Sequence, residues 1–332
     1  GRWRELGCSE QAVTTTDRTT TSSAGPPGMG GAPRWKRWKG WIGFALGLTL
    51  LVAAAVVIAS SPGMIDELWT KLRNAPAWTV VVLAVSPVLS WVLVGLCLRV
   101  LLLRHGVVGR FEMLMLVGSA WLLNHLPMRP GLIGRVGYHK AVNNIRVRDA
   151  VEATVWSLVF GALANVMVLS ITLLLPADLN AWGLSAALLS PIPLLVVASL
   201  LLRSRNASLL LIGLMYRYAD LLVWLVRYAV VFIALGIDAS PVRIALVTAV
   251  SQLAQLVPIT GGGLGFREWG VGLAARQGGH AMQAAMSADL INRAIETLWV
   301  LPIGLFSTWW VARRVRTEFG SLSRTQDASP SR

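Results

Sequence analysis

The chain has 332 residues, of which 55% are hydrophobic and only 14% are charged, and its mean hydropathy is +0.62. Such a composition excludes an ordinary soluble domain and predicts a polytopic membrane protein. The formal net charge of +14 does not indicate a nucleic-acid partner, because the basic residues cluster at the ends of apolar segments rather than among aromatic residues. Two cysteines and four scattered histidines have neither disulfide nor metal-ligand spacing, so we expect no metal and no cofactor.

The first 40 residues are predicted to be a disordered basic tail on the cytoplasmic side. Residues 1–33 are rich in Thr, Ser, Gly and Pro and show no apolar period. The block RWKRWKG at 34–40 then places basic residues and tryptophans directly before an apolar run, which is typical of an anchor at the membrane interface. That run, 41–60, has the length of a membrane span rather than that of a signal-peptide core.

Six apolar segments approach the ~20 residues that a helix needs to cross a bilayer. They are 41–60, 78–98, 151–175, 182–202, 208–235 and 289–311. Two further segments, 111–148 and 243–288, each contain an apolar helix, a Gly/Pro break and a more polar return. The predicted fold is therefore an all-α polytopic membrane protein with about six full transmembrane helices plus two re-entrant broken helices. One transmembrane domain at 41–315 would be followed by a cytoplasmic tail at 316–332.

Basic residues in the short loops set the predicted orientation. Arginines cluster near 99–110, 203–205 and 313–316, whereas the connections 176–181 and 236–241 contain neither Lys nor Arg. If both broken segments are re-entrant, every loop obeys the positive-inside rule and both termini are cytoplasmic in an inner-membrane protein. The apolar helix of the second segment is only about 22 Å long at 1.5 Å per residue, too short to cross unaided. The helix of the first segment is longer, so its full crossing stays an alternative.

Glycines and prolines mark the predicted breaks in these two segments. The break residues are Pro127, Gly131 and Gly134 in the first segment and Pro258, Gly261, Gly262, Gly263 and Gly265 in the second. Four glycines within five positions cannot hold a helix against the backbone entropy they release. Backbone broken at membrane depth is tolerated only where it is buried in protein or lines a wet cavity, which Arg267 and Glu268 would then face.

The two broken segments resemble each other, and aligning their Gly-Leu stretches superposes Arg135 on Arg267. Because the predicted topology makes one segment enter from each side, we expect an inverted repeat. Opposed halves that meet near the midplane are the usual plan of secondary transporters, whose substrate site lies at the broken helices. A guanidinium beside exposed backbone N–H groups suits a phosphate, which makes both arginines candidate binding residues.

Ionisable residues inside the spans are further candidates, because each costs about 3 kcal/mol to insert. Arg217 and Asp220 lie at i, i+3 and can pair on one helix, and Arg227 lies roughly on the opposite side of that helix. A polar stripe at i, i+3, i+4 and i+7 begins the last span and consists of Asp289, Asn292, Arg293 and Glu296. For each of these groups, a structural salt bridge and a functional role stay open.

No catalytic or nucleotide-binding motif accompanies these residues. The stretch GGGLGFRE lacks the Gly-Lys-Ser/Thr end of a phosphate-binding loop, and its glycine spacing does not fit GxGxxG. The sequence contains neither GxSxG nor HExxH, and no nucleophile has a base beside it. We therefore do not expect an enzyme.

Three stretches resemble the lysylphosphatidylglycerol synthase transmembrane-region family, a family of flippase-like integral membrane domains. They are LNHLPMRPGLIGR at 123–135, VPITGGGLGFRE at 257–268 and LINRAIETLWVLPIG at 290–304. The last stretch is similar to the closing span of the family with its Asn/Tyr-Arg pair, here Asn292 and Arg293. The chain departs from the usual double glycine of the first loop, where it has Arg129-Pro130-Gly131.

The resemblance implies movement of a lipid between leaflets, in the best-known case of an aminoacylated phosphatidylglycerol. Larger family members add a soluble C-terminal synthase domain. This chain ends about twenty residues after its last predicted span, so aminoacyl transfer is not expected of it.

Taken together, the residues and the resemblance lead to the hypothesis that the protein translocates an anionic membrane lipid, such as a phospholipid or a polyprenyl-phosphate-linked sugar. Arg135, Arg267 and Arg293 would hold the phosphate of the headgroup, and the glycine breaks would admit it. Glu268 and Glu296 would pair with those arginines when the site is empty.

Two alternative functions stay open. The protein could be a non-transporting accessory subunit that scaffolds a membrane-bound glycosyltransferase or synthase acting on a lipid-linked substrate. It could also be an ion-coupled carrier of a small solute, in which case Asp220 or Asp289 would bind the coupling ion.

Overall fold

The computed structural model describes residues 49, 56, 64–126, 130–176, 179–256, 263, 265–277 and 282–327. Within these residues the fold is entirely helical, which confirms the predicted all-α class. The predicted tail at 1–40 lies outside the described residues, and so does nearly all of the predicted first span at 41–60. The predicted break residues Pro127, Pro258, Gly261 and Gly262 also lie outside them.

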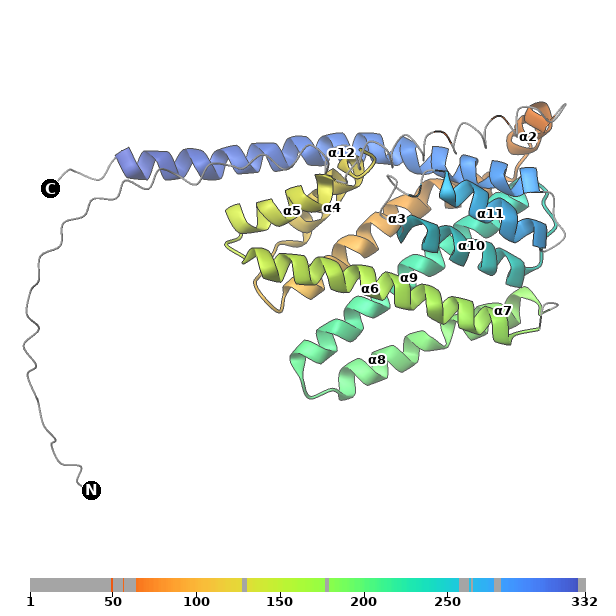
Figure 1. Cartoon of the computed structure of the whole chain (residues 1–332), viewed down its shortest axis with the longest axis horizontal. Coiled ribbons are helices and arrows are strands. Elements are labelled where there is room, and N and C mark those ends of the chain that lie inside the picture. Colours follow the sequence, from red (N-terminus) through yellow and green to blue (C-terminus); the bar gives the residue numbers. More distant parts are fainter. Residues whose placement is uncertain are drawn as a thin grey trace, which may run out of the picture.

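The described helices follow one another with short connections (Figure 1). In chain order they are α2 (Met64–Arg73), α3 (Ala77–Leu102), α4 (Arg110–Leu123), α5 (Pro130–Ala141), α6 (Val147–Leu174), α7 (Ala181–Leu189), α8 (Pro191–Leu201), α9 (Arg205–Ala234), α10 (Pro241–Leu256), α11 (Phe266–Gln277) and α12 (Met282–Asp327). Several begin at a proline, whose missing N–H has no partner in the first turn of a helix in any case.

Five helical stretches are long and apolar enough to cross a membrane. They are Ala77–Leu102, Val147–Leu174, Ala181–Leu201, Arg205–Ala234 and Met282–Glu318. These stretches match five of the six predicted spans and make the chain a multi-pass membrane protein. Their outward faces carry exposed Val, Leu and Trp side chains, as expected where lipid replaces water.

Two of these stretches differ in detail from the prediction. The span expected at 182–202 consists of α7 and α8, which meet at Ser190, because Pro191 cannot donate the backbone hydrogen bond that would continue α7. The last helix, α12, continues to Asp327 and so extends well into the predicted C-terminal tail.

The two segments predicted to be broken each form a pair of short helices. Of these helices, α4 has 14 residues, α5 has 12, α10 has 16 and α11 has 12. At 1.5 Å per residue each is about 18–24 Å long, less than the ~30 Å of a hydrocarbon core. The members of each pair pack on each other, and both α4 and α11 also pack on α12. In Figure 1, α12 runs along one edge of the molecule beside both pairs.

The glycines of the two pairs have different roles. Gly263 and Gly265, between α10 and α11, have φ values of +74° and +78°, so they are true break residues. Gly131 and Gly134 lie inside α5, so their prediction as break residues was wrong. Gly131 instead allows close helix packing, because a Cβ atom at this position would collide with the backbone of Ala120 on α4.

The central helix of the fold is α9. It contributes Trp224 and Tyr228 to a core shared with α10, α11 and α12, and Tyr218 and Leu221 to a core shared with α6, α7 and α10. Its Leu214 packs into a third core with α3, α4 and α6. The polar side chains of α9 are therefore held in place from several sides.

Replacing Gly131 with Ala should destabilise the protein by about 1–3 kcal/mol, because the new methyl group meets the backbone of α4 rather than a side chain that can move. Gly134→Ala is the matched control, since a Cβ atom there has no neighbour within 4 Å. The measurement is the free energy of unfolding of the two variants in mild detergent. Equal stability of the two variants would contradict the packing role of Gly131.

Candidate functional site

A buried arginine lies directly after the glycine break, in the first turn of α11. Arg267 is only 1% exposed. Its Nε donates to both carboxylate oxygens of Asp289, at 2.8 and 3.1 Å, and its Nη1 lies 3.4 Å from Oε2 of Glu296. Both carboxylates belong to α12, so this guanidinium fixes the start of α11 against that helix.

Arg227 of α9 joins the same group of charges. Its Nη2 lies 3.7 Å from Oε2 of Glu296, so Glu296 lies between Arg227 and Arg267. The guanidinium carbon of Arg227 lies 3.5 Å from the centroid of the Trp224 ring, and the guanidinium carbon of Arg267 lies 5.2 Å from it. A ring face attracts cations at these distances, which partly replaces the water that both arginines have lost.

A second ion pair joins α11 to α12 beside the first. Arg293 Nη1 lies 2.9 Å from Oε1 of Glu268, whose side chain is fully buried. The site therefore contains three arginines and three carboxylates, namely Arg227, Arg267, Arg293, Glu268, Asp289 and Glu296. We call these six residues the ion cluster. Its formal charges cancel, which is the condition for burying so many ions.

Two hydroxyl groups complete the surroundings of Asp289. The hydroxyl of Tyr228 donates a hydrogen bond to Asp289, and it lies 2.6 Å from Oγ of Ser251 on α10. The amide of Asn292, the remaining member of the predicted stripe, is fully buried and has no hydrogen-bond partner within the described residues. The stripe of α12 therefore faces inward, toward α9 and α11.

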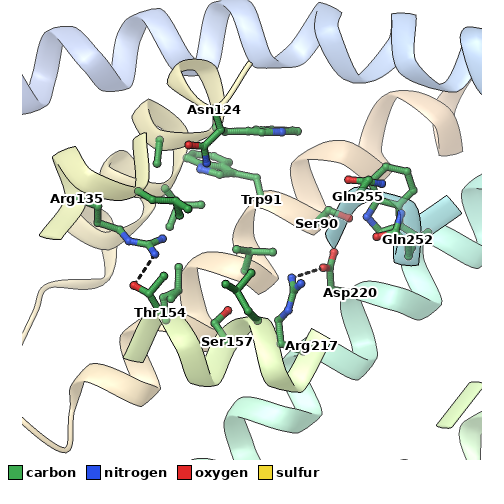
Figure 2. Close-up of a pocket in the computed structure, with 18 of the residues that line it drawn as sticks. Ser90, Trp91, Asn124, Arg135, Thr154, Ser157, Arg217, Asp220, Gln252 and Gln255 are labelled. Carbon is green, nitrogen blue, oxygen red and sulfur yellow. Dashed lines mark hydrogen bonds and ion pairs between the residues drawn. The ribbon is translucent and has the colours of Figure 1, made fainter. Parts of the chain in front are cut away.

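The ion cluster borders a cavity of about 180 Å³. Its lining consists of Trp121, Asn124, His125, Gln255, Arg267, Arg293 and Glu296. A second cavity of about 230 Å³ shares Trp121, Asn124, Gln255 and Glu296 with the first, so the two adjoin. Residues of α3, α4, α5, α6, α9, α10 and α12 line this second cavity, which we call the central cavity (Figure 2).

Arg135 of α5 lines the central cavity opposite Arg217 and Asp220 of α9 (Figure 2). Its side chain is largely buried, at 7% exposure, and its Nη2 donates to Oγ1 of Thr154 at 2.9 Å. No carboxylate of the described residues lies within ion-pair distance of Arg135, whereas Arg217 and Asp220 pair at 2.8 Å. The central cavity thus has one guanidinium whose charge no neighbouring side chain in the described part balances.

The sequence placed Arg135 and Arg267 in equivalent positions of two repeats, and the structure gives them different surroundings. Arg267 contacts two carboxylates, whereas Arg135 contacts a hydroxyl. They line adjoining cavities, and Glu296 lines both. Two arginines at equivalent positions of a sequence pattern therefore need not have equivalent counter-charges.

Sequence reasoning missed Trp224 and Tyr228. Aromatic residues in an apolar helix usually belong to a core, and nothing in the pattern marks these two as partners of ions. One signal was present, because Trp224 precedes Arg227 by three residues and such a spacing places the two side chains on one helix face.

For metal binding, the described residues contain no group of three or more His, Cys, Asp or Glu side chains that could hold an ion.

Arg267→Ala should lower the free energy of unfolding by about 3–5 kcal/mol, because it leaves buried carboxylates without their cation. Arg276→Ala is the matched control on the same helix, and as a surface change it should alter stability by less than about 0.5 kcal/mol. Unfolding in a detergent titration measures both. If Arg267→Ala proved as stable as Arg276→Ala, the ion cluster would not hold α11 in place.

The chain was also compared with known proteins. No protein-family model, no curated protein and no solved structure matches it. The geometry of the two cavities and the charges that line them are therefore the structural basis of the functional proposal.

Proposed function

We propose that the protein translocates an anionic lipid across the membrane, and that Arg135 receives the phosphate of its headgroup. The observation that carries this proposal is the buried Arg135 guanidinium on the wall of the central cavity, with no carboxylate beside it in the described residues. A charge inside a membrane protein costs about 3 kcal/mol to insert. A bound anion would offset this cost, and a guanidinium can bind a phosphate through two parallel hydrogen bonds.

Other polar groups of the central cavity suit a phosphate or the glycerol beside it. Gln252 Nε2 is buried and has no hydrogen-bond partner within the described residues, so it can donate to a ligand. Ser157 adds a hydroxyl to the wall. Arg217 already pairs with Asp220, and this pair supplies a polar wall without net charge.

The adjoining cavity offers the headgroup a second binding site. Arg267 and Arg293 line it, and Glu296 lies at the boundary between the two cavities. In our proposal a phosphate moving from Arg135 competes with Glu296 for Arg267. The phosphate thus has a guanidinium beside it in both cavities, which offsets the cost of burying its charge.

The proposal includes the predicted membrane arrangement. We propose that the α4–α5 and α10–α11 pairs are re-entrant hairpins of an inverted repeat in a cell membrane protein with both termini cytoplasmic. Their short helices and their shared packing on α12 support this arrangement. The resemblance of the broken segments to flippase-like domains supports a lipid as the substrate. We assign no coupling ion, because Asp220 and Asp289 each have an arginine at 2.8 Å.

The test is lipid exchange between leaflets in vesicles containing the purified protein and a fluorescent phosphatidylglycerol. Arg135→Gln should slow exchange about tenfold or more, because a lost hydrogen bond to a charged group costs about 1.5–3 kcal/mol and 1.4 kcal/mol is a factor of ten. Arg148→Gln, at an exposed arginine of α6, is the control and should exchange lipid at the wild-type rate. Wild-type exchange by Arg135→Gln would refute the assigned role of Arg135.

A further inference from the structure

A third hollow of the molecule is a groove of about 450 Å³ between α5 and α6. Four α5 residues and three α6 residues line it, namely Leu132, Ile133, Val136, Gly137, Val151, Thr154 and Val155. Thr154 is the only one of them with a polar side chain. Ile133 and Val155 are exposed, so the groove opens on the outer surface of the helices. No charged side chain lines it, which suits a hydrocarbon chain and not a polar ligand.

The groove adjoins the central cavity. Leu132 and Thr154 line both hollows. Thr154 Oγ1 accepts the hydrogen bond of Arg135 and donates to the carbonyl oxygen of Ala150 at 2.9 Å. Through its hydrogen bond to Thr154, the unbalanced guanidinium of Arg135 therefore lies in the central cavity beside the residues that this cavity shares with the apolar groove; Figure 2 shows the hydrogen bond.

We propose that the groove between α5 and α6 receives an acyl chain of the phospholipid whose phosphate binds Arg135, and thus forms the lateral port for that lipid. This inference depends on the proposed function and adds the route by which its substrate enters. In an anionic phospholipid, glycerol joins apolar acyl chains to a charged phosphate, and the two adjoining hollows likewise place an apolar surface next to a cation. The chain can stay in an apolar environment while the headgroup leaves water for the central cavity.

The two helices give the port its width. Gly137 of α5 lines the groove, and a Cβ atom at this position would have no neighbour within 4 Å. A side chain added there therefore begins in open space and reduces the width of the groove. On the facing helix, Val155 is 50% exposed and can likewise be enlarged toward the groove.

The experiment measures binding of two probes to the full chain in mild detergent. Dioleoyl phosphatidylglycerol carries both chain and headgroup, and glycerol 3-phosphate carries only the headgroup chemistry. Val155→Trp and Gly137→Leu should each weaken binding of the phospholipid about tenfold or more and leave binding of glycerol 3-phosphate unchanged. The matched control is Val166→Trp, since Val166 is 52% exposed on the same α6 helix but does not line the groove, and it should bind both probes like the wild type.

The outcomes separate the two proposals. If Val155→Trp and Gly137→Leu bind phosphatidylglycerol as tightly as Val166→Trp, the groove does not hold the chain, and the port is refuted. Sensitivity of that binding to Arg135→Gln would then still support the proposed function. If Arg135→Gln leaves the binding of both probes unchanged, the proposed function fails, and the port fails with it because its headgroup has no site. Unchanged binding of glycerol 3-phosphate shows that a groove variant is folded.

Discussion

The contact between Arg267 and the two carboxylates of α12 is the constraint on which the rest of the site depends. A buried ion costs several kcal/mol unless an opposite charge lies beside it. Arg267 is therefore tied to Asp289 and Glu296, and through the ring of Trp224 it is also tied to α9. These ties hold the helix that follows the glycine break against α9 and α12, which contribute Trp224 and Glu296 to the lining of the central cavity. The positive φ values of Gly263 and Gly265 make this geometry possible, because they let the backbone turn just before Arg267.

The opposite wall has another electrostatic character. The ion cluster balances its own charges, whereas Arg135 has only a hydroxyl partner among the described side chains. In the proposed mechanism the unbalanced Arg135 attracts the anion first, and the anion then competes with Glu296, at the boundary of the two cavities, for Arg267. The groove between α5 and α6 adds an apolar surface near the same cation, which suits the proposed acyl chain.

Much of this organisation could be predicted from the sequence, because apolar length and helical period are local properties. Five predicted spans match helices long enough to cross a membrane, and the spacing of Asp289 and Glu296 placed them correctly on one inward face of α12. Other features depend on contacts between distant segments. The sequence alone does not distinguish a glycine that breaks a helix from one that allows close helix packing, so Gly131 was wrongly predicted to be a break residue. The roles of Trp224, Tyr228 and Thr154 depend on which helices are neighbours, and no periodicity of a single helix contains that information.

Whether Arg135 binds a lipid phosphate can be seen most directly in an experimental structure of the protein in nanodiscs that contain phosphatidylglycerol. We expect a lipid phosphate within hydrogen-bonding distance of Arg135, in the central cavity, with the ion cluster of α9, α11 and α12 still assembled beside it. Lipid density confined to the outer surface of the helices, with Arg135 contacting only protein groups, would refute the proposed lipid site.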